Sequence, residues 1–129
     1  MVNLNDLVQT ADWKTEKHSP VIEIIGTPKK EGTIIKLTIG KEIPHPNTTE
    51  HHITWINAYF LPVGEKFPIQ IGKCSFDSHG ASTKGANTST VYTNYEATIS
   101  LKTEKSGTII AFSFCNIHGL WKSELDLKL

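Results

Sequence analysis

Alternation of apolar and polar residues along short segments is the feature that most constrains the fold of this chain. Side chains on one face of a β-strand are two positions apart, so a strand with one buried face shows this pattern. Residues 121–129 are the clearest case, because Trp, Ser and three Leu alternate there with Lys, Glu, Asp and Lys. The chain also has 15 threonines and 15 isoleucines, and β-branched residues of this kind favour strands.

Seven further segments have the length and composition of strands, and turn residues separate them. Their number and spacing predict an all-β fold, an immunoglobulin-like antiparallel β-sandwich. The seven segments are residues 21–25, 33–39, 53–61, 68–72, 91–95, 97–102 and 108–114.

Only the amino-terminal segment has helical spacing. Leu4, Leu7, Val8 and Ala11 follow Asn3, which is a suitable cap, and together they predict a short amino-terminal helix. The 129 residues contain no internal repeat and no linker, so we expect residues 1–129 to form a single domain.

Charge and hydropathy exclude several classes of partner. The net charge is zero and all 13 basic residues are lysines, so the chain has no arginine for bidentate recognition of bases, and we expect no nucleic-acid partner. The amino terminus lacks the features of a signal peptide. The apolar runs are far shorter than a membrane span, so we expect no membrane partner and a cytoplasmic location. In a reducing compartment, the two cysteines favour metal binding or simple burial over a disulfide.

Cysteine and histidine are close together at one predicted strand end. Cys115 and His118 form a Cys-x-x-His turn directly after residues 108–114, and such a turn lets a thiolate and an imidazole bind one metal ion. The spacing alone is equally compatible with a buried Cys115 and an exposed, unrelated His118. The other cysteine, Cys74, is predicted to be a core residue.

The remaining histidines are unevenly placed. His45 lies between two prolines, which stiffen the backbone around it, and His18 lies in a turn that ends at Pro20. His51 and His52 are adjacent before the longest predicted strand, so their side chains point in opposite directions and only one of them can join a shared site. His79 has no evident partner in the sequence, and we expect a structural role for it.

Three separated motifs resemble those of the superoxide reductase family, which includes the neelaredoxins and desulfoferrodoxins. The resemblance covers essentially the whole chain in order, and because the first cysteine is Cys74 it is to the one-iron class. The motifs are Glu-Lys-His-Ser-Pro at residues 16–20, His-Pro-Asn-Thr-Thr-Glu-His-His-Ile at 45–53 and Cys-Asn-Ile-His-Gly-Leu-Trp at 115–121.

The resemblance implies one mononuclear non-haem iron per chain. Its five ligands would be four histidines in a plane and one axial cysteine: His18, His45, His51, His118 and Cys115. Five ligands leave one octahedral position vacant, where a small anion can bind. Glu16 and Lys17 are implied as catalytic residues, Lys17 by attracting superoxide and Glu16 by moving onto the vacant position of the oxidised iron.

The implied reaction is the one-electron reduction of superoxide to hydrogen peroxide. Each turnover needs one external electron, and the chain has no Gly-x-Gly-x-x-Gly motif for a nicotinamide or flavin dinucleotide. A rubredoxin-like electron donor is therefore implied as the partner. The one-iron members of the family also imply a homotetramer, in which strand edges such as residues 121–129 pair between subunits.

Three other functions use similar residues. A cupredoxin-like electron-transfer protein has His and Cys ligands, but it commonly adds an axial methionine, and the only methionine here is Met1. A structural zinc site needs four ligands and no vacancy. A cysteine hydrolase would use Cys115 as nucleophile, with a base from another loop. The metal content of the protein distinguishes all three from an iron enzyme.

Overall fold

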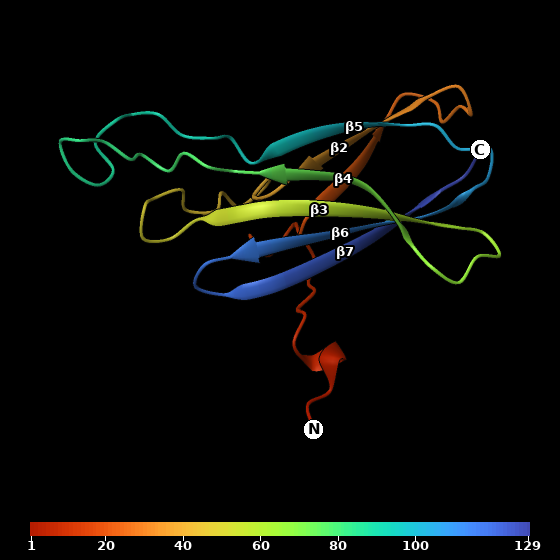
Figure 1. The fold of residues 1–129 in the computed structure, drawn as a ribbon, viewed down its shortest axis with the longest axis horizontal. Helices are drawn as coiled ribbons and strands as arrows, with labels where there is room; N and C mark the ends of the chain where they lie inside the picture. The colour runs from red at the N-terminus through yellow and green to blue at the C-terminus, as the bar shows by residue number, and fades with distance from the viewer.

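Seven β-strands form two antiparallel sheets that pack face to face (Figure 1). The structure is a computed structural model that describes residues 1–129. The three-stranded sheet has the order β1–β2–β5, with strands Val21–Ile25, Thr33–Thr38 and Glu96–Leu101. The four-stranded sheet has the order β4–β3–β6–β7, with strands Ile69–Ser75, Ile53–Pro62, Gly107–Cys115 and Gly119–Leu127. The predicted all-β sandwich is confirmed.

The core lies between the two sheets and follows the predicted alternation. In β6, every second residue from Gly107 to Cys115 is buried, and the intervening residues are half-buried. Ile109 and Ala111 of this strand pack in one apolar cluster with Ile35 of β2. Because β6 lies between β3 and β7 in the sheet, its inward residues have a neighbouring strand on each side. The buried stripe ends at Cys115, which is fully buried.

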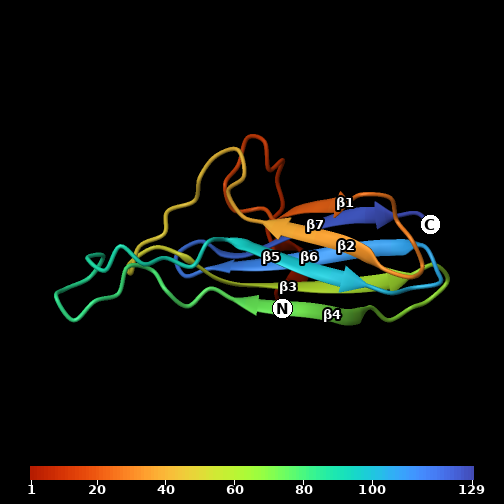
Figure 2. The same cartoon turned by 90° about the horizontal axis from the view of Figure 1, so that it is seen from above.

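Strand register brings four separate segments to one end of the sandwich. Ile53 at the start of β3 pairs with Cys115 at the end of β6, so residues just before β3 lie beside the turn after β6. In the other sheet, Val21 at the start of β1 pairs with Thr38 at the end of β2. Figure 1 shows these chain segments at the left ends of the strands, next to the green-to-cyan loop between β4 and β5. In Figure 2 this loop projects beyond the strand ends as well.

Two of the elements predicted from the sequence, one helix and one strand, do not form. The amino-terminal segment forms only one 3₁₀ turn, Leu4–Asp6, although Asn3 does cap it by accepting a hydrogen bond from the N–H of Asn5. None of the residues in this turn is buried, and a short helix without packing is unstable in water. Residues 91–95 form no strand. Tyr92 makes only an isolated bridge to His79, because this stretch belongs to the long loop that precedes β5.

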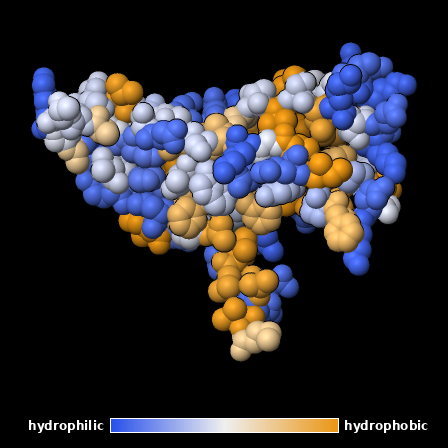
Figure 3. Space-filling model, in the orientation of Figure 1, coloured by the Kyte–Doolittle hydropathy of each residue, from blue (hydrophilic) through white to orange (hydrophobic).

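The first eight residues extend away from the sandwich as an arm. Gln9 pairs with the edge of β7 at Trp121, and the residues before it project outwards, as the orange arm in Figure 3 shows. Part of the β7 edge, which we expected to be free for subunit pairing, is therefore occupied by the chain itself. Cys74, the predicted core residue, is half-buried and packs against the rim of the core. No helix in the structure has the length and apolar character needed to cross a membrane.

Candidate metal centre

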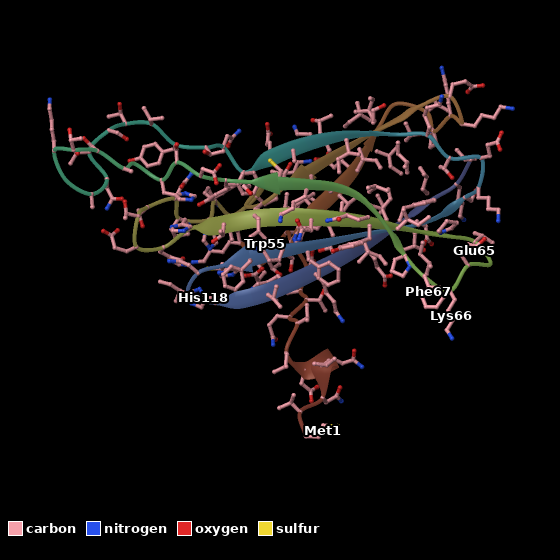
Figure 4. The ribbon with its side chains drawn as sticks, viewed as in Figure 1. Met1, Trp55, Glu65, Lys66, Phe67 and His118 are labelled. Carbon is pink, nitrogen blue, oxygen red and sulfur yellow. The ribbon has the colours of Figure 1, made fainter.

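Five side chains with metal-binding atoms converge where β6 ends. One ligand atom from each of His18, His45, His51 and Cys115 lies within 4.8 Å of every other. The fifth, His118, adjoins the group, because its Nδ1 lies 3.2 Å from Nε2 of His18 and 3.7 Å from Sγ of Cys115. Figure 4 shows His118 at the end of the molecule where β6 turns into β7. The structure thus brings together all five residues that the motifs indicated.

The four imidazole rings stand at the corners of a square. Going round it, the ring centroids of His18, His45, His51 and His118 are 4.7, 4.8, 5.1 and 4.8 Å apart, and the diagonal from His18 to His51 is 6.5 Å. Neighbouring rings meet at steep angles, from 57° to 76°. Four rings that surround one point in this way can direct one nitrogen each towards it, which is the requirement for a planar four-nitrogen site.

The cysteine lies on the inner side of this square. Cys115 is fully buried, whereas His118 is exposed and His51 is half-buried. The sulfur of Cys115 is 3.6 Å from Nε2 of His45 and 3.7 Å from Nδ1 of His118. A metal ion in the centre would therefore have sulfur on the protein side, and a small molecule can approach it from the solvent side.

His18 is held from three directions. Its Nδ1 donates to the carboxylate of Glu16, which leaves Nε2 free to face the cluster. Ser113 of β6 donates from its hydroxyl to the backbone carbonyl of His18, at 3.0 Å. The indole of Trp121 stacks on the imidazole, with centroids 4.7 Å apart and planes 12° apart. Trp121 also donates from its ring N–H to the carbonyl of His118, so it supports two ligands at once.

His45 is fixed by a buried tyrosine. Its Nδ1 donates to the carbonyl of Pro46 at 2.7 Å, and this leaves Nε2 as the unprotonated, ligand-binding nitrogen. The hydroxyl of Tyr95 donates to the same carbonyl at 2.9 Å and accepts from the N–H of Ile53 at 3.1 Å. Tyr95 therefore joins the His45 loop to the first residue of β3. Burial raises the pKa of Tyr95 to about 12, so the phenol keeps its proton at neutral pH.

The turn before His45 needs a glycine. Gly40 has φ of +75°, a region that residues with a Cβ rarely adopt. A Cβ added there would lie 2.6 Å from the backbone nitrogen of His45. The loop that carries His45 therefore folds back tightly against the end of β2, and only glycine permits this approach.

His51 supplies the observation that best tests whether the site suits a metal. Its Nε2 is buried and has no hydrogen-bond partner in the protein. A buried polar atom without a partner costs free energy, so an ordered site normally provides one. Imidazole nitrogens with one thiolate form a donor set that binds transition metals well. The residues present therefore fit a metal ion, and the unpartnered nitrogen indicates where it is needed.

The electrostatics favour the neutral form of two of the imidazoles, those of His45 and His51. Burial, together with the nearby charges of His18, His51 and Lys17, lowers the pKa of His45 to about 4. Burial also lowers the pKa of His51, with contributions from His118 and Lys17. Because only neutral imidazole binds a metal, these ligands are ready for one at neutral pH.

Glu16 and Lys17 lie beside the cluster in different ways. The carboxylate of Glu16 accepts hydrogen bonds from the backbone N–H groups of His18 and Ser19, at 2.5 and 2.9 Å, besides the bond from the His18 ring. Burial opposes ionisation of Glu16, but these hydrogen bonds outweigh it and lower its pKa. Lys17 is half-buried, and its positive charge reaches His45 and His51. Glu16 thus lies on the outer side of His18, away from the centre of the square.

The second histidine of the adjacent pair is not part of the cluster. His52 points away from His51 and stacks on His79, with ring centroids 3.7 Å apart and planes 9° apart. The strand argument that only one of the two can join a shared site agrees with this arrangement. Sequence reasoning missed the partner of His79, because it comes from a segment 27 positions earlier in the chain.

The support from Tyr95, Trp121 and Asn116 was also missed. Asn116 accepts from the N–H of His52 and donates to the carbonyl of Glu50, so it joins the Cys-x-x-His turn to the segment before β3. The residue types alone do not predict these contacts. Only the position of Asn116 inside the Cys-x-x-His turn could have indicated a supporting role.

Comparison with known proteins identifies the family. A sequence model described as Desulfoferrodoxin matches residues 10–124. A superoxide reductase of Pyrococcus furiosus is 51% identical over 127 residues, which cover 97% of this chain and 99% of that protein. A neelaredoxin of Megalodesulfovibrio gigas is 51% identical over 125 residues, which cover 96% of both chains. The chain belongs to the desulfoferrodoxin family.

A solved structure in this family has the same fold. The superoxide reductase (neelaredoxin) of Archaeoglobus fulgidus, in the reduced form, is 56% identical in sequence, with a TM-score of 0.91 over 95% of this chain and 99% of that one. Matches over nearly the full length of one-domain neelaredoxins confirm the resemblance to the superoxide reductase family. The metal site of this family member is the cluster of four histidines and one cysteine, His₄Cys.

Proposed function

We propose that this chain is a superoxide reductase, which reduces superoxide to hydrogen peroxide at a mononuclear iron. One observation carries the proposal: four imidazoles and one thiolate converge on a single point, with the sulfur buried and the opposite side accessible. The relatives named superoxide reductase and neelaredoxin support the same function. The balanced reaction is superoxide plus one electron plus two protons, giving hydrogen peroxide.

The donor set favours iron over the alternatives. The proposed ligands are Nε2 of His18 and His45, Nδ1 of His118, Nε2 of His51 and Sγ of Cys115. Iron, when bound, supplies the one-electron couple that superoxide reduction requires, and zinc has no such couple. A cupredoxin-like site would commonly add an axial methionine, but Met1 is fully exposed at the tip of the arm (Figure 4). A cysteine hydrolase is also disfavoured, because Cys115 is fully buried.

Lys17 is proposed to attract the anionic substrate. Its charge already lowers the pKa of His45 and His51, so it is close enough to raise the local concentration of an anion at the open side. We expect Lys17→Ala to slow the capture of superoxide and to weaken its salt dependence, with iron still bound. Lys14→Ala is the matched control, since it removes the same charge from a lysine whose ammonium lies over the Trp13 ring. Equal rates in the two variants would exclude this role for Lys17.

Glu16 is proposed to occupy the open position when the centre is oxidised. To do so it must release the backbone N–H groups of His18 and Ser19, which it holds in this structure. We expect Glu16→Gln to change the visible spectrum of the oxidised protein and to leave that of the reduced protein nearly unchanged. Identical oxidised spectra for the variant and the original protein would exclude ligation by Glu16.

The assembly and partners follow from the family resemblance. We propose that residues 1–129 act as one iron-binding domain, that the chain forms a homotetramer, and that a rubredoxin-like protein delivers the electrons. A cytoplasmic location is proposed because both cysteines are unpaired, as is usual in a reducing compartment. Sedimentation analysis tests the tetramer, and reduction of the oxidised protein by rubredoxin tests the donor.

One experiment tests the function directly. The protein is loaded with Fe(II) without oxygen and mixed with a measured amount of superoxide, and hydrogen peroxide and oxygen are then quantified. A reductase yields one hydrogen peroxide per superoxide and releases no oxygen, whereas a dismutase releases one oxygen for every two superoxide ions. Oxygen release in that proportion, or no reaction, would exclude the proposal.

A further inference from the structure

His79 lies beside the segment that connects two residues of the metal centre, and it is not itself part of the cluster. It is 8% exposed, and it comes from the long loop between β4 and β5 that extends past the end of the sandwich (Figures 1 and 2). A polar ring that is buried in a loop needs a reason, because burial removes it from water. Its ring makes one hydrogen bond and one stacking contact to the short segment 47–52, which connects the ligands His45 and His51, and its backbone forms an isolated bridge to Tyr92.

Two contacts join the His79 ring to this segment. The ring stacks on His52, with centroids 3.7 Å and planes 9° apart. Its Nδ1 donates to Oδ1 of Asn47 at 2.7 Å, and the amide nitrogen of Asn47 donates to the carbonyl of Thr93, at 3.0 Å. His52 is also held in place, since its own Nδ1 donates to the carbonyl of Thr48. The His79 ring therefore contacts one residue near each end of segment 47–52.

The same loop holds the middle of the segment. The hydroxyl of Thr49 donates to the carbonyl of His79, and the N–H of Thr49 donates to the side chain of Asn87. Asn87 in turn donates to the carboxylate of Glu50, at 2.9 and 3.1 Å. Hydrogen bonds from one loop thus reach segment 47–52 at residues 47, 49 and 50, and the ring stack adds residue 52.

The opposite side of the segment is held by the Cys-x-x-His turn. Asn116 accepts from the N–H of His52 at 2.8 Å and donates from its own N–H to the carbonyl of His52 at 3.1 Å. His52 therefore lies between the His79 ring and the turn that carries Cys115 and His118. Movement of His52 would displace His51 directly, because the two are adjacent in the chain.

We propose that His79 is a positioning residue of the metal centre, which acts by clamping segment 47–52 through the His52 stack and the Asn47 hydrogen bond. This inference rests on the metal centre and not on the reaction that takes place there. Partners outside the ligand shell commonly change metal affinity or activity by about 10- to 100-fold. The effect of His79 should be at the low end of this range, because it acts through the backbone of neighbouring residues.

Three substitutions separate the two contacts. His79→Phe keeps the ring stack and removes the donor to Asn47, whereas His79→Gln keeps an amide donor and removes the stack. His79→Ala removes both. Gly107→Ala is the control for general destabilisation, because a Cβ there would lie 2.3 Å from the carbonyl oxygen of Leu61, at the other end of β6.

The test measures Co(II) affinity by competition with a chelator, the visible spectrum of the Co(II) protein and the melting temperature of the metal-free protein. We expect His79→Ala to lower the affinity about 10-fold and to shift the Co(II) spectrum, with partial effects in the Phe and Gln variants. Gly107→Ala should lower the melting temperature and leave both affinity and spectrum unchanged.

Two results would overturn the proposal. One is an affinity and spectrum of His79→Ala equal to those of the original protein. The other is an equal loss of affinity in His79→Ala and Gly107→Ala at equal loss of stability. Neither result depends on superoxide, so a failure here is distinguishable from a failure of the proposed function, in which the original protein would bind metal tightly and not reduce superoxide.

Discussion

The two ends of the sandwich are built on the same strands but with different kinds of loop. At the metal end, buried histidines have hydrogen bonds to backbone or side-chain oxygens, and the tightly packed Gly40 lies directly against the backbone of the ligand His45. At the far end the turns are exposed and charged, as with the ion pair between Lys105 and Glu65, at 3.2 Å. Figure 4 shows His118 at one end and Glu65 to Phe67 at the other.

The difference shows what the fold alone provides. The shared apolar core runs along β6 from one end to the other and determines where the strands lie. It does not determine where four imidazole rings point. At the metal end the ring positions depend on contacts such as Tyr95 with the Pro46 carbonyl and Trp121 with His18, and the far end has no counterpart to them. Changes at the two ends should therefore have different consequences.

Cys115→Ser should have the largest effect, because it removes the only sulfur donor from the centre. We expect loss of superoxide reduction and of any visible absorption that arises from thiolate bound to oxidised iron. Cys74→Ser is the matched control, since Cys74 is half-buried on β4 and lies outside the cluster. A Cys115→Ser protein that keeps the absorption would remove Cys115 from the ligand set.

The pH dependence of stability should come from the metal end. The pKa of His45 is about 4 in the folded protein and about 6.5 when unfolded, so the unfolded state binds more protons between these values. The contribution of His45 to the free energy of unfolding is therefore complete above pH 6.5, and it is lost as the pH falls towards 4. Denaturant unfolding of the metal-free protein at several pH values checks this, and His45→Gln should give a shallower slope. An equal slope in both proteins would assign the effect to other groups.

Substitutions of two glycines, one at each end of the sandwich, compare how well the loops tolerate a larger residue. Gly40 and Gly26 have similar positive φ angles, +75° and +80°, but an added Cβ meets the backbone of His45 at the first and nothing within 4 Å at the second. Gly26→Ala should cost only the strain of its conformation, about 1 kcal/mol of unfolding free energy. Gly40→Ala should cost more and also lower the metal affinity. Equal metal affinity in the two variants would mean that the His45 loop tolerates displacement.

The smallest effect is expected at the far end. Lys105→Ala breaks the ion pair with Glu65, in which both side chains are more than half exposed. Water and salt screen such a pair, so the free energy of unfolding should change by less than about 1 kcal/mol and the metal affinity should not change. A measurable loss of metal affinity in this variant would contradict the independence of the two ends.

Sequence reasoning succeeded where the information is local. The β3 and β6 strands were predicted to within one residue at each end, because each has a long apolar stripe that the core buries. The amino-terminal helix failed because its apolar residues have no surface to pack against, and residues 91–95 failed because their β-rich composition belongs to a loop. Local composition cannot show whether a segment finds a neighbour.

The same limit applies to the metal centre. The five ligand positions came from three motifs whose internal spacing is visible in the sequence. The residues that orient those ligands come from distant positions and have no motif of their own. His79 and Tyr95 contact the segment between His45 and β3 across more than 25 positions, so only the folded chain reveals them.

X-ray absorption at the iron edge of the Fe(II)-loaded protein tests the central claim most directly, because it counts the atoms bound to the metal. We predict one iron per chain, with four nitrogen ligands from imidazole and one sulfur ligand, and loss of the sulfur signal in Cys115→Ser. A first shell of nitrogen and oxygen without sulfur in the original protein would contradict a centre shared by Cys115 and the four histidines.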